Sequence, residues 1–388
     1  MLRSARIAGL GSRLALLALG LGLSWPSLAN AAQDCPDLHP PAVLSATPDR
    51  GLESMFTAYG NSGRGWTGGD GTYSAALAGG REVWMFADTF MEPITPPTRP
   101  RGVEFVRNAL VTQTKRRLST LHGGTHMVPE ALINPRAPHD WYWMGEGNVA
   151  NGRLQVPLTQ WEWSGAKSTL FPVAWVSNAL ASFPVNNLRA APTIKRLPSA
   201  TGIQWGAWVA RDYPYTYMYG VEDLSSTKYM HIARVRGRSL TAHWSYYTGG
   251  DPAQSSSWSS HERRSIRVTD YVQNAFSVQR LHPRLYMLVS MDTSYPFSSD
   301  VVAYFSCTAV GPFLDKTPLY TAPESGADGT YHNRSVYTYA AHVHPELSSP
   351  TRLIVSYDVN SLRPRVGGPL WKHVSLYRPR FVDIDLGY

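Results

Sequence analysis

The sequence predicts an all-β fold. Tyr, Trp and Phe supply 12% of the 388 residues, charged residues only 16%, and the chain holds 32 Gly and 29 Pro; this composition is typical of short strands joined by tight turns. No long stretch has helical periodicity. Paired runs of aromatic or β-branched residues recur instead, roughly every 60–75 residues. Five such pairs, most of them followed by further strand-like runs, predict a five-bladed β-propeller with about four antiparallel strands per blade. A β-sandwich of about fifteen strands is the alternative.

Each predicted blade begins with a hairpin. The five hairpins pair residues 72–77 with 81–88, 146–150 with 153–158, 205–211 with 215–220, 275–279 with 285–292, and 339–343 with 353–358. Asn151-Gly152, between the strands of the second hairpin, is typical of a two-residue type I′ turn. Because each blade packs on its neighbours around one axis, we expect one propeller over residues 63–388, although chain length suggests two domains.

The N-terminal residues 1–31 have the pattern of a secretory signal peptide. Its parts are basic residues, a short apolar run and a small-residue cleavage site. These are Arg3, Arg6 and Arg13, then residues 14–23, then residues 28–31. The apolar run is shorter than the roughly 20 residues that span a bilayer, and no later run reaches that length. We therefore expect a secreted protein, periplasmic or extracellular, with residues 32–62 as an N-terminal arm along one edge of the propeller.

The two cysteines and the charges bear on compartment and partners. In an oxidising compartment Cys35 and Cys307 could form a disulfide that joins the arm to the body, and two unpaired cysteines are the alternative.

The formal net charge is +8, but no Lys/Arg run is longer than residues 115–117 and no nucleic-acid motif occurs. We expect a monomer with a polysaccharide partner, no nucleic-acid partner and no membrane span.

The hairpin pattern places acidic residues at one face. The start of the first strand of a hairpin and the end of the second lie at the same end of the ladder. Asp70 opens the first hairpin and Asp88 closes it, so we expect the two to be neighbours. Glu146 opens the second hairpin, and Glu222 follows the third. Carboxylates are thus predicted to gather at one mouth of the propeller.

Such an arrangement suits glycoside hydrolysis. The reaction needs one carboxylic acid to protonate the leaving oxygen and one carboxylate to activate water or attack carbon. Neighbouring carboxylates raise one another's pKa, which keeps one of them protonated near neutral pH. We predict Asp70 as the base, Glu146 or Glu222 as the acid, and Asp88 as the neighbour that orients or tunes them.

Several candidates have a structural alternative. Acidic residues at strand ends often bond their own turn, and this is our interpretation of Asp292 and Asp358. Aromatic and histidine side chains near the acids could bind substrate. The alternative for the tryptophans is packing between blades, and the alternative for the two histidines is a packed or solvated pair without a ligand. The substrate-binding candidates are Trp66, Trp143, Trp205, His342 and His344.

Of these candidates, His342 and His344 are the two that could also bind a metal. Their spacing points both side chains to the same face of the fifth hairpin's first strand. They could line the axial channel or hold a metal through water. We predict no cofactor, although a structural Ca²⁺ could bind in that channel, and the metal content stays open. The chain has no Gly-x-Ser-x-Gly elbow, His-Glu-x-x-His, Walker loop or paired-Cys motif.

Two segments of the first hairpin carry a family resemblance. Gly68-Gly69-Asp70-Gly71-Thr72-Tyr73-Ser74 and Val83-Trp84-Met85-Phe86-Ala87-Asp88-Thr89-Phe90 resemble the opening blade of a family of secreted bacterial propellers, long catalogued as a domain of unknown function. Further similar segments are residues 107–111, 143–147, 218–220, 311–313, 344–347, 355–358 and 377–382. The resemblance spans nearly the whole mature chain.

This resemblance implies a five-bladed propeller akin to arabinanase and xylosidase-type glycosidases. Some members of the family are similar to enzymes that cleave D-arabinan in mycobacterial cell walls. By resemblance, Asp70 matches the acid of the first blade, and Glu146 falls where a second carboxylate, more often aspartate, is expected.

The leading hypothesis is a secreted glycosidase acting on a furanose-rich, arabinan-like polysaccharide. We favour inversion of configuration, which predicts a separation of roughly 6.5–9.5 Å between the two carboxyl groups. The alternative is a carbohydrate-binding propeller of the cell envelope without catalysis. A structural envelope protein is the third hypothesis.

Overall fold

The computed structural model describes residues 35, 38–165 and 171–388. The expected signal peptide, residues 1–31, lies outside the described residues. Strands dominate this part of the chain, which has only two α-helices, α1 (Arg50–Gly60) and α2 (Pro369–Lys372), and three 3₁₀ turns. The all-β prediction is confirmed. None of the described helices is long and apolar enough to cross a membrane.

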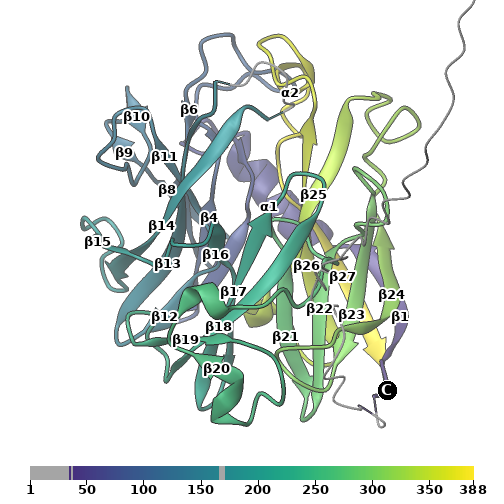
Figure 1. Ribbon diagram of the computed structural model, residues 1–388. Coiled ribbons are helices and arrows are strands. Elements are labelled where there is room, and N and C mark those ends of the chain that lie inside the picture. The colour runs from purple at the N-terminus through teal and green to yellow at the C-terminus, as the bar shows by residue number, and fades with distance from the viewer. Residues whose placement is uncertain (1–34, 36–37, 166–170) are drawn as a thin grey trace, which may run out of the picture. The chain divides into compact units, whose positions relative to one another are not determined.

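Five antiparallel sheets of four or five strands make up most of the structure (Figure 1). The first contains β3 (Tyr73–Leu77), β4 (Arg81–Phe86), β7 (Ala109–Thr114) and β8 (Arg117–Leu121). The second contains β11 (Trp141–Met144), β12 (Asn148–Ala150), β13 (Arg153–Trp163), β14 (Val173–Pro184) and β15 (Thr193–Arg196). The third contains β16 (Ile203–Asp212), β17 (Tyr215–Asp223), β18 (Lys228–Arg236), β19 (Trp244–Tyr247) and β20 (Trp258–Ser259).

The last two large sheets and two small ones complete the set. The fourth contains β21 (Ser277–His282), β22 (Leu285–Met291), β23 (Asp300–Ser306) and β24 (Leu314–Thr321). The fifth contains β25 (Val336–Val343), β26 (Arg352–Ser361), β27 (Arg380–Gly387) and β1 (Ala42–Pro48). The small sheets are β2 (Gly68–Gly69) with β5 (Thr89–Phe90) and β6 (Phe105–Val106), and β9 (Gly123–Gly124) with β10 (Pro129–Glu130).

All five predicted hairpins occur, as β3–β4, β12–β13, β16–β17, β21–β22 and β25–β26. The turn of the second has positive φ at both central residues, 50° at Asn151 and 71° at Gly152. A type I′ turn requires this geometry, and Asn-Gly adopts it at low cost. The local turn chemistry therefore favours the pairing of β12 with β13.

The fifth sheet joins the two ends of the described chain. β1 pairs antiparallel with β27, with Val43 opposite Leu386, and it forms the outer strand of the sheet. Within the predicted N-terminal arm, residues 32–62, the structure thus has a strand, β1, and a helix, α1. The Asp49 side chain caps α1 by accepting from the N–H groups of Gly51 (2.9 Å) and Leu52 (3.0 Å). Cys35 and Cys307 form a disulfide.

Each large sheet contacts the next one in the chain, and the fifth returns to the first. β3 contacts β12, β16 contacts both β13 and β21, and β25 contacts β21 and β22. The fifth sheet reaches the first through side chains: Thr72 Oγ1 donates to Asp358 Oδ1 at 2.7 Å, and Ser74 Oγ lies 2.5 Å from His344 Nδ1. Apolar side chains fill the spaces between sheets and bury their faces from water.

Candidate functional site

Asp70 and Asp88 are backbone partners at the open end of the first hairpin. The Asp70 N–H donates to the Asp88 carbonyl at 3.1 Å, and the Ala87 N–H donates to the Asp70 carbonyl at 2.8 Å. Both aspartates are partly exposed. Gly71 follows with a φ of 88°, a left-handed conformation that favours glycine. The predicted proximity of Asp70 and Asp88 is therefore observed.

Asp358 of β26 is a third carboxyl beside these two. Its Oδ2 accepts from the Gly71 N–H and its Oδ1 from Thr72 Oγ1, both at 2.7 Å. Burial raises the pKa of Asp358 to about 7, although both hydrogen bonds favour the ionised form. A residue interpreted from the sequence as structural thus lies next to Asp70.

The pKa values of Asp70 and Asp88 are both raised, but the groups that oppose the rise differ. Burial, followed by the charges of Asp88 and Asp358, raises the pKa of Asp70 well above its usual range. Its Oδ2 accepts from the Tyr339 hydroxyl at 2.5 Å, which only partly offsets this rise. Burial also raises the pKa of Asp88, whereas the positive charge of Arg107 lowers it and offsets part of this rise. Both pKa values are therefore raised, that of Asp70 more than that of Asp88.

Two donors stabilise the Asp88 carboxylate. Arg107 Nη1 lies 3.1 and 3.0 Å from its two oxygens, and Trp143 Nε1 donates to Oδ1 at 2.9 Å. Trp143 comes from β11, so these bonds connect the first sheet to the second. A carboxylate bonded to a guanidinium and an indole N–H keeps its charge when partly buried.

Glu146 lies between β11 and β12, and its side chain is inside the protein. Its backbone N–H donates to the Gly206 carbonyl at 3.2 Å, and the residue is 5% exposed. No hydrogen-bond partner of its carboxyl occurs among the described residues. Burial raises the pKa of Glu146 well above its usual range; Glu346 raises it further, whereas Arg211 lowers it. Glu146 therefore keeps its proton to a higher pH than an ordinary glutamate does.

Tyr73 connects Glu146 with the aspartate group. Burial raises the pKa of the Tyr73 hydroxyl, and the charges of Glu146 and Asp358 raise it further. The Tyr73 side chain therefore lies within electrostatic reach of both carboxyls. Its ring stacks on His342 with centroids 4.6 Å apart.

Glu222 belongs to a different group of charges. It accepts from Arg267 Nε at 2.6 Å and Arg267 Nη2 at 2.9 Å, and His231 Nε2 lies 3.4 Å away. The hydrogen bonds from Arg267 are the main cause that lowers the pKa of Glu222. A carboxylate that is ionised and accepts two hydrogen bonds from an arginine is poorly suited to donate a proton.

Two of the predicted substrate-binding tryptophans are in the core. Trp66 is fully buried and packs against Phe56 and Phe86. Trp205 is also fully buried, and its Nε1 donates to Glu262 Oε1 at 2.9 Å. Their rings are closed to a sugar, so the packing interpretation replaces substrate binding for both. Trp143 remains partly exposed beside Asp88.

His342 and His344 are buried side by side, with ring centroids 5.2 Å apart. His342 Nδ1 lies 2.8 Å from the Ala340 carbonyl, and its Nε2 lies 3.2 Å from that of Thr72. Burial lowers the pKa of His342 to about 4 and that of His344 well below its usual range. Both are therefore neutral interior side chains rather than part of an open surface.

The described residues contain no group of three or more His, Cys, Asp or Glu side chains arranged to hold a metal ion. His344 Nε2 is buried without a hydrogen-bond partner, but one imidazole nitrogen is not a coordination shell for Ca²⁺, which prefers six to eight oxygens. The Ca²⁺ considered from the sequence thus has no matching set of ligands, and no step below uses it.

Comparison with known proteins places the chain in a family. Residues 53–386 match the family described as a domain of unknown function, DUF5005. The chain belongs to this family. No curated protein matches its sequence.

Solved structures show how far the DUF5005 fold extends. A protein of proposed hydrolase activity from Bacteroides ovatus is similar with a TM-score of 0.69 and 21% identity, over 87% of this chain and 90% of that one. Weaker similarity links the chain to the α-L-arabinofuranosidase PaAbf62A of Podospora anserina (TM-score 0.47, 10% identity, 84% and 93% covered). The chain is similar at this weaker level to a GH43_1 enzyme of Xanthomonas citri, with a TM-score of 0.46 and 12% identity over 86% of this chain and 92% of that one. The first similarity shows a shared fold over most of both chains.

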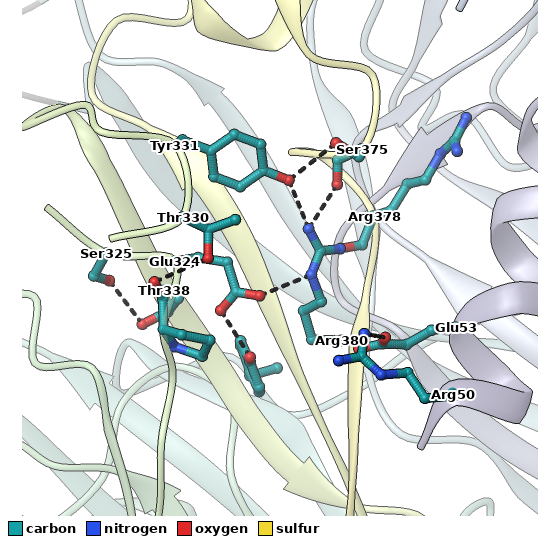
Figure 2. Close-up of polar contacts among 12 residues, drawn as sticks. Arg50, Glu53, Glu324, Ser325, Thr330, Tyr331, Thr338, Ser375, Arg378 and Arg380 are labelled. Atoms are coloured by element: carbon teal, nitrogen blue, oxygen red, sulfur yellow. Dashed lines mark hydrogen bonds and ion pairs between the residues drawn. The ribbon is translucent and has the colours of Figure 1, made fainter. Parts of the chain in front are cut away.

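A buried ion pair of the DUF5005 domain supports the strand that carries Asp358. Glu324 Oε1 accepts from Arg380 Nε (Figure 2), with a distance of 2.9 Å. Its Oε2 accepts from the Tyr357 hydroxyl at 2.8 Å. Arg380 Nη2 also donates to the Tyr331 hydroxyl at 2.7 Å. Consecutive side chains of a strand point to opposite faces, so Tyr357 is fixed on one face of β26 while Asp358 points to the other.

Two cavities of the DUF5005 domain lie away from the carboxyl group. One of about 250 Å³ borders the Glu324–Arg380 pair and also includes Glu53 of α1. The other, of about 350 Å³, is lined by residues of β15 and β19 with their neighbouring loops. Neither includes Asp70 or Glu146.

Sequence reasoning missed Asp358, Tyr73, Tyr339 and Arg107 as members of the site. In the predicted hairpins Asp358 ends its second strand (353–358) as Asp88 ends that of the first (81–88), and this repeated position was an available signal. Arg107 opens one of the segments that carry the family resemblance. The tyrosines have no distinguishing pattern in an aromatic-rich chain.

Proposed function

We propose that this DUF5005 protein is a glycoside hydrolase and that its reaction takes place at Asp70, Asp88, Asp358 and Glu146. The observation that carries the proposal is the group of three carboxyls in which Asp88 and Asp358 both lie beside Asp70, each with a pKa raised by burial and with different hydrogen-bond partners. A reaction that needs an acid and a base within one site uses carboxyls with different ionisation.

We also propose that the five sheets are the five blades of a propeller, with β1 completing the last blade. Support comes from the contacts of each sheet with the next and from the hydrogen bonds that join the fifth sheet to the first. In such an arrangement the first strands surround an axis, and Asp70 and Glu146 are both attached to them.

The roles follow from the environment of each carboxyl. Glu146, buried and without a hydrogen-bond partner among the described residues, is the general acid that protonates the leaving oxygen. Asp70, once ionised, is the base that takes a proton from the attacking water, and its raised pKa gives it the proton affinity that this step needs. Asp88 keeps its charge beside Arg107 and thereby tunes Asp70. We assign no catalytic role to Glu222 and retain inversion as the expected outcome.

The proposed substrate is a furanose-rich, arabinan-like polysaccharide of a bacterial cell wall, and the proposed location is outside the cytoplasm. The Cys35–Cys307 disulfide supports an oxidising compartment. The signal-peptide pattern of residues 1–31 and the family resemblance agree with it.

The proposal is tested with a panel of polysaccharides that includes arabinans, with release of reducing ends as the measurement. The Asp70→Asn and Glu146→Gln variants are expected to lower turnover by about 10²–10⁴-fold, the contribution of a general acid or base. Glu162→Gln, at an exposed position of β13, is the matched control and should keep full activity. Polysaccharide binding without turnover by the wild type would favour a binding protein instead.

A second substrate separates the two roles. An aryl glycoside with a good leaving group needs little protonation of the departing oxygen. Glu146→Gln should therefore recover much of its activity on this substrate, whereas Asp70→Asn should stay inactive. The opposite pattern would exchange the roles of the two residues.

A further inference from the structure

An exposed aromatic surface adjoins the carboxyl group. Arg107, whose Nη1 bonds Asp88, lies over the rings of Trp141 (4.4 Å to the centroid), Trp163 (5.3 Å) and Phe105 (5.6 Å). Trp163 ends β13 and is 58% exposed, and Phe105 of β6 is 39% exposed. Two exposed apolar rings thus lie within 6 Å of one guanidinium.

Further tryptophan rings, of which Trp141 and Trp161 are buried, support this surface. Trp163 packs on Trp141 with centroids 5.2 Å apart, and Trp141 packs on Trp143 at 5.9 Å. Trp143 in turn packs on Trp161 at 4.9 Å and bonds Asp88 through its Nε1. The exposed rings are therefore connected to the Asp88 carboxylate by packed side chains with little freedom to move.

The chemistry of this surface fits a carbohydrate. Sugar rings present C–H groups on their faces, which pack on aromatic rings, and hydroxyls on their edges, which accept from cationic donors. Arg107 uses Nη1 for Asp88, and its Nε and Nη2 have no hydrogen-bond partner among the described residues. An exposed aromatic surface next to free donors is a common form of ligand site.

We propose that Phe105, Arg107 and Trp163 form a platform that holds a sugar residue of the polysaccharide beyond the residue that reacts at Asp70. The occupant is an extended carbohydrate chain, because the platform is continuous with Asp88 through Arg107 and Trp143. This proposal rests on the proposed function and adds to it a requirement for a polymeric substrate.

The test measures polysaccharide binding without turnover. Asp70→Asn protein is run by affinity gel electrophoresis through gels containing each polysaccharide of the panel, arabinan included. Adding Trp163→Ala or Phe105→Ala should weaken binding about tenfold, as expected for loss of one aromatic contact. Trp163→Phe keeps a ring and should retain most of the affinity. Tyr213→Ala, 97% exposed in the turn between β16 and β17, is the control and should bind like the parent.

Each outcome separates the platform from the hydrolase. Equal binding by the Trp163→Ala, Tyr213→Ala and parent proteins overturns the platform even if the enzyme is active. Weaker binding by Trp163→Ala, with no turnover by the wild type on any polysaccharide, keeps the platform and rejects hydrolysis. In an active enzyme the platform predicts that Trp163→Ala raises KM for the polymer more than it lowers kcat. The sedimentation coefficients of the Trp163→Ala and parent proteins are also compared. If they differ while polysaccharide binding is the same, the surface binds a second copy of the chain, and the proposal is rejected.

Discussion

Glu146 and Asp358 are buried carboxyls, and their ionisation connects stability to pH. Burial raises the pKa of Asp358 to about 7 from its ordinary 3.8, and it raises the pKa of Glu146 in the same direction. A group that binds its proton more tightly in the folded state contributes its full stability below the unfolded pKa. That contribution is lost as the pH rises through the folded pKa. For Asp358 the loss falls between about pH 4 and pH 7.

Replacing Glu146 by Gln tests this relation at one residue. Gln has nearly the same shape and no charge, so Glu146→Gln should stabilise the protein at pH 8 by about 1–2 kcal/mol and change little at pH 4. The measurement is the midpoint of thermal unfolding at both pH values, with Glu162→Gln as the exposed control. A stabilisation that is equal at both pH values would contradict the assignment.

Single residues of the site differ in how far sequence could predict them. Asp70 and Asp88 are paired by one hairpin, so their proximity follows from local strand geometry. Asp358 bonds Gly71 across 287 positions of the chain, a contact with no local signal. The environment of Glu222 depends on Arg267, 45 positions away, which converts a predicted acid into an ion-pair partner.

Helix α1 shows the corresponding difference for an element. The five hairpins were predictable because turns such as Asn151-Gly152 act locally. α1 was missed although Leu52, Met55, Phe56 and Tyr59 follow the i, i+3, i+4, i+7 spacing of an amphipathic helix, because this signal extends over only eleven residues. Its stability comes from tertiary packing: Phe56 contacts Trp66, Trp84, Phe86 and Phe381 with ring centroids 5.4, 5.1, 6.1 and 5.6 Å apart.

Truncating Phe56 should therefore loosen α1 from the sheets. Phe56→Ala is expected to lower the free energy of unfolding by about 3–5 kcal/mol, the usual effect of removing a buried ring. Phe56→Leu should lower it less, because it refills part of the space. Urea denaturation measures both, and Leu44→Ala in exposed β1 is the control. A loss below about 1 kcal/mol for Phe56→Ala would show that α1 contributes little to the fold.

At the scale of the whole molecule, the disulfide constrains distant parts of the chain. Cys35 precedes β1 and Cys307 follows β23, with a sequence separation of 272 residues. Closing so long a loop restricts the unfolded chain strongly. A double variant that carries Cys35→Ser and Cys307→Ser should therefore have a free energy of unfolding about 2–5 kcal/mol lower than that of the wild type.

Thermal unfolding with and without reductant measures this effect. Reductant should lower the midpoint of the wild type toward that of the double variant and leave the double variant unchanged. Equal midpoints for both proteins without reductant would mean that the link adds no stability.

The pairing of β1 with β27 gives biosynthesis a fixed order of events. The first described strand to leave the ribosome finds its partner only when the last one has been made. At roughly 5–20 residues per second this delay is about 20–70 s. Throughout it, β1 lacks its partner β27, and an unpaired strand edge of this kind attracts other chains. Nascent chains stalled before residue 380 should consequently be the species most prone to aggregate and most dependent on chaperones.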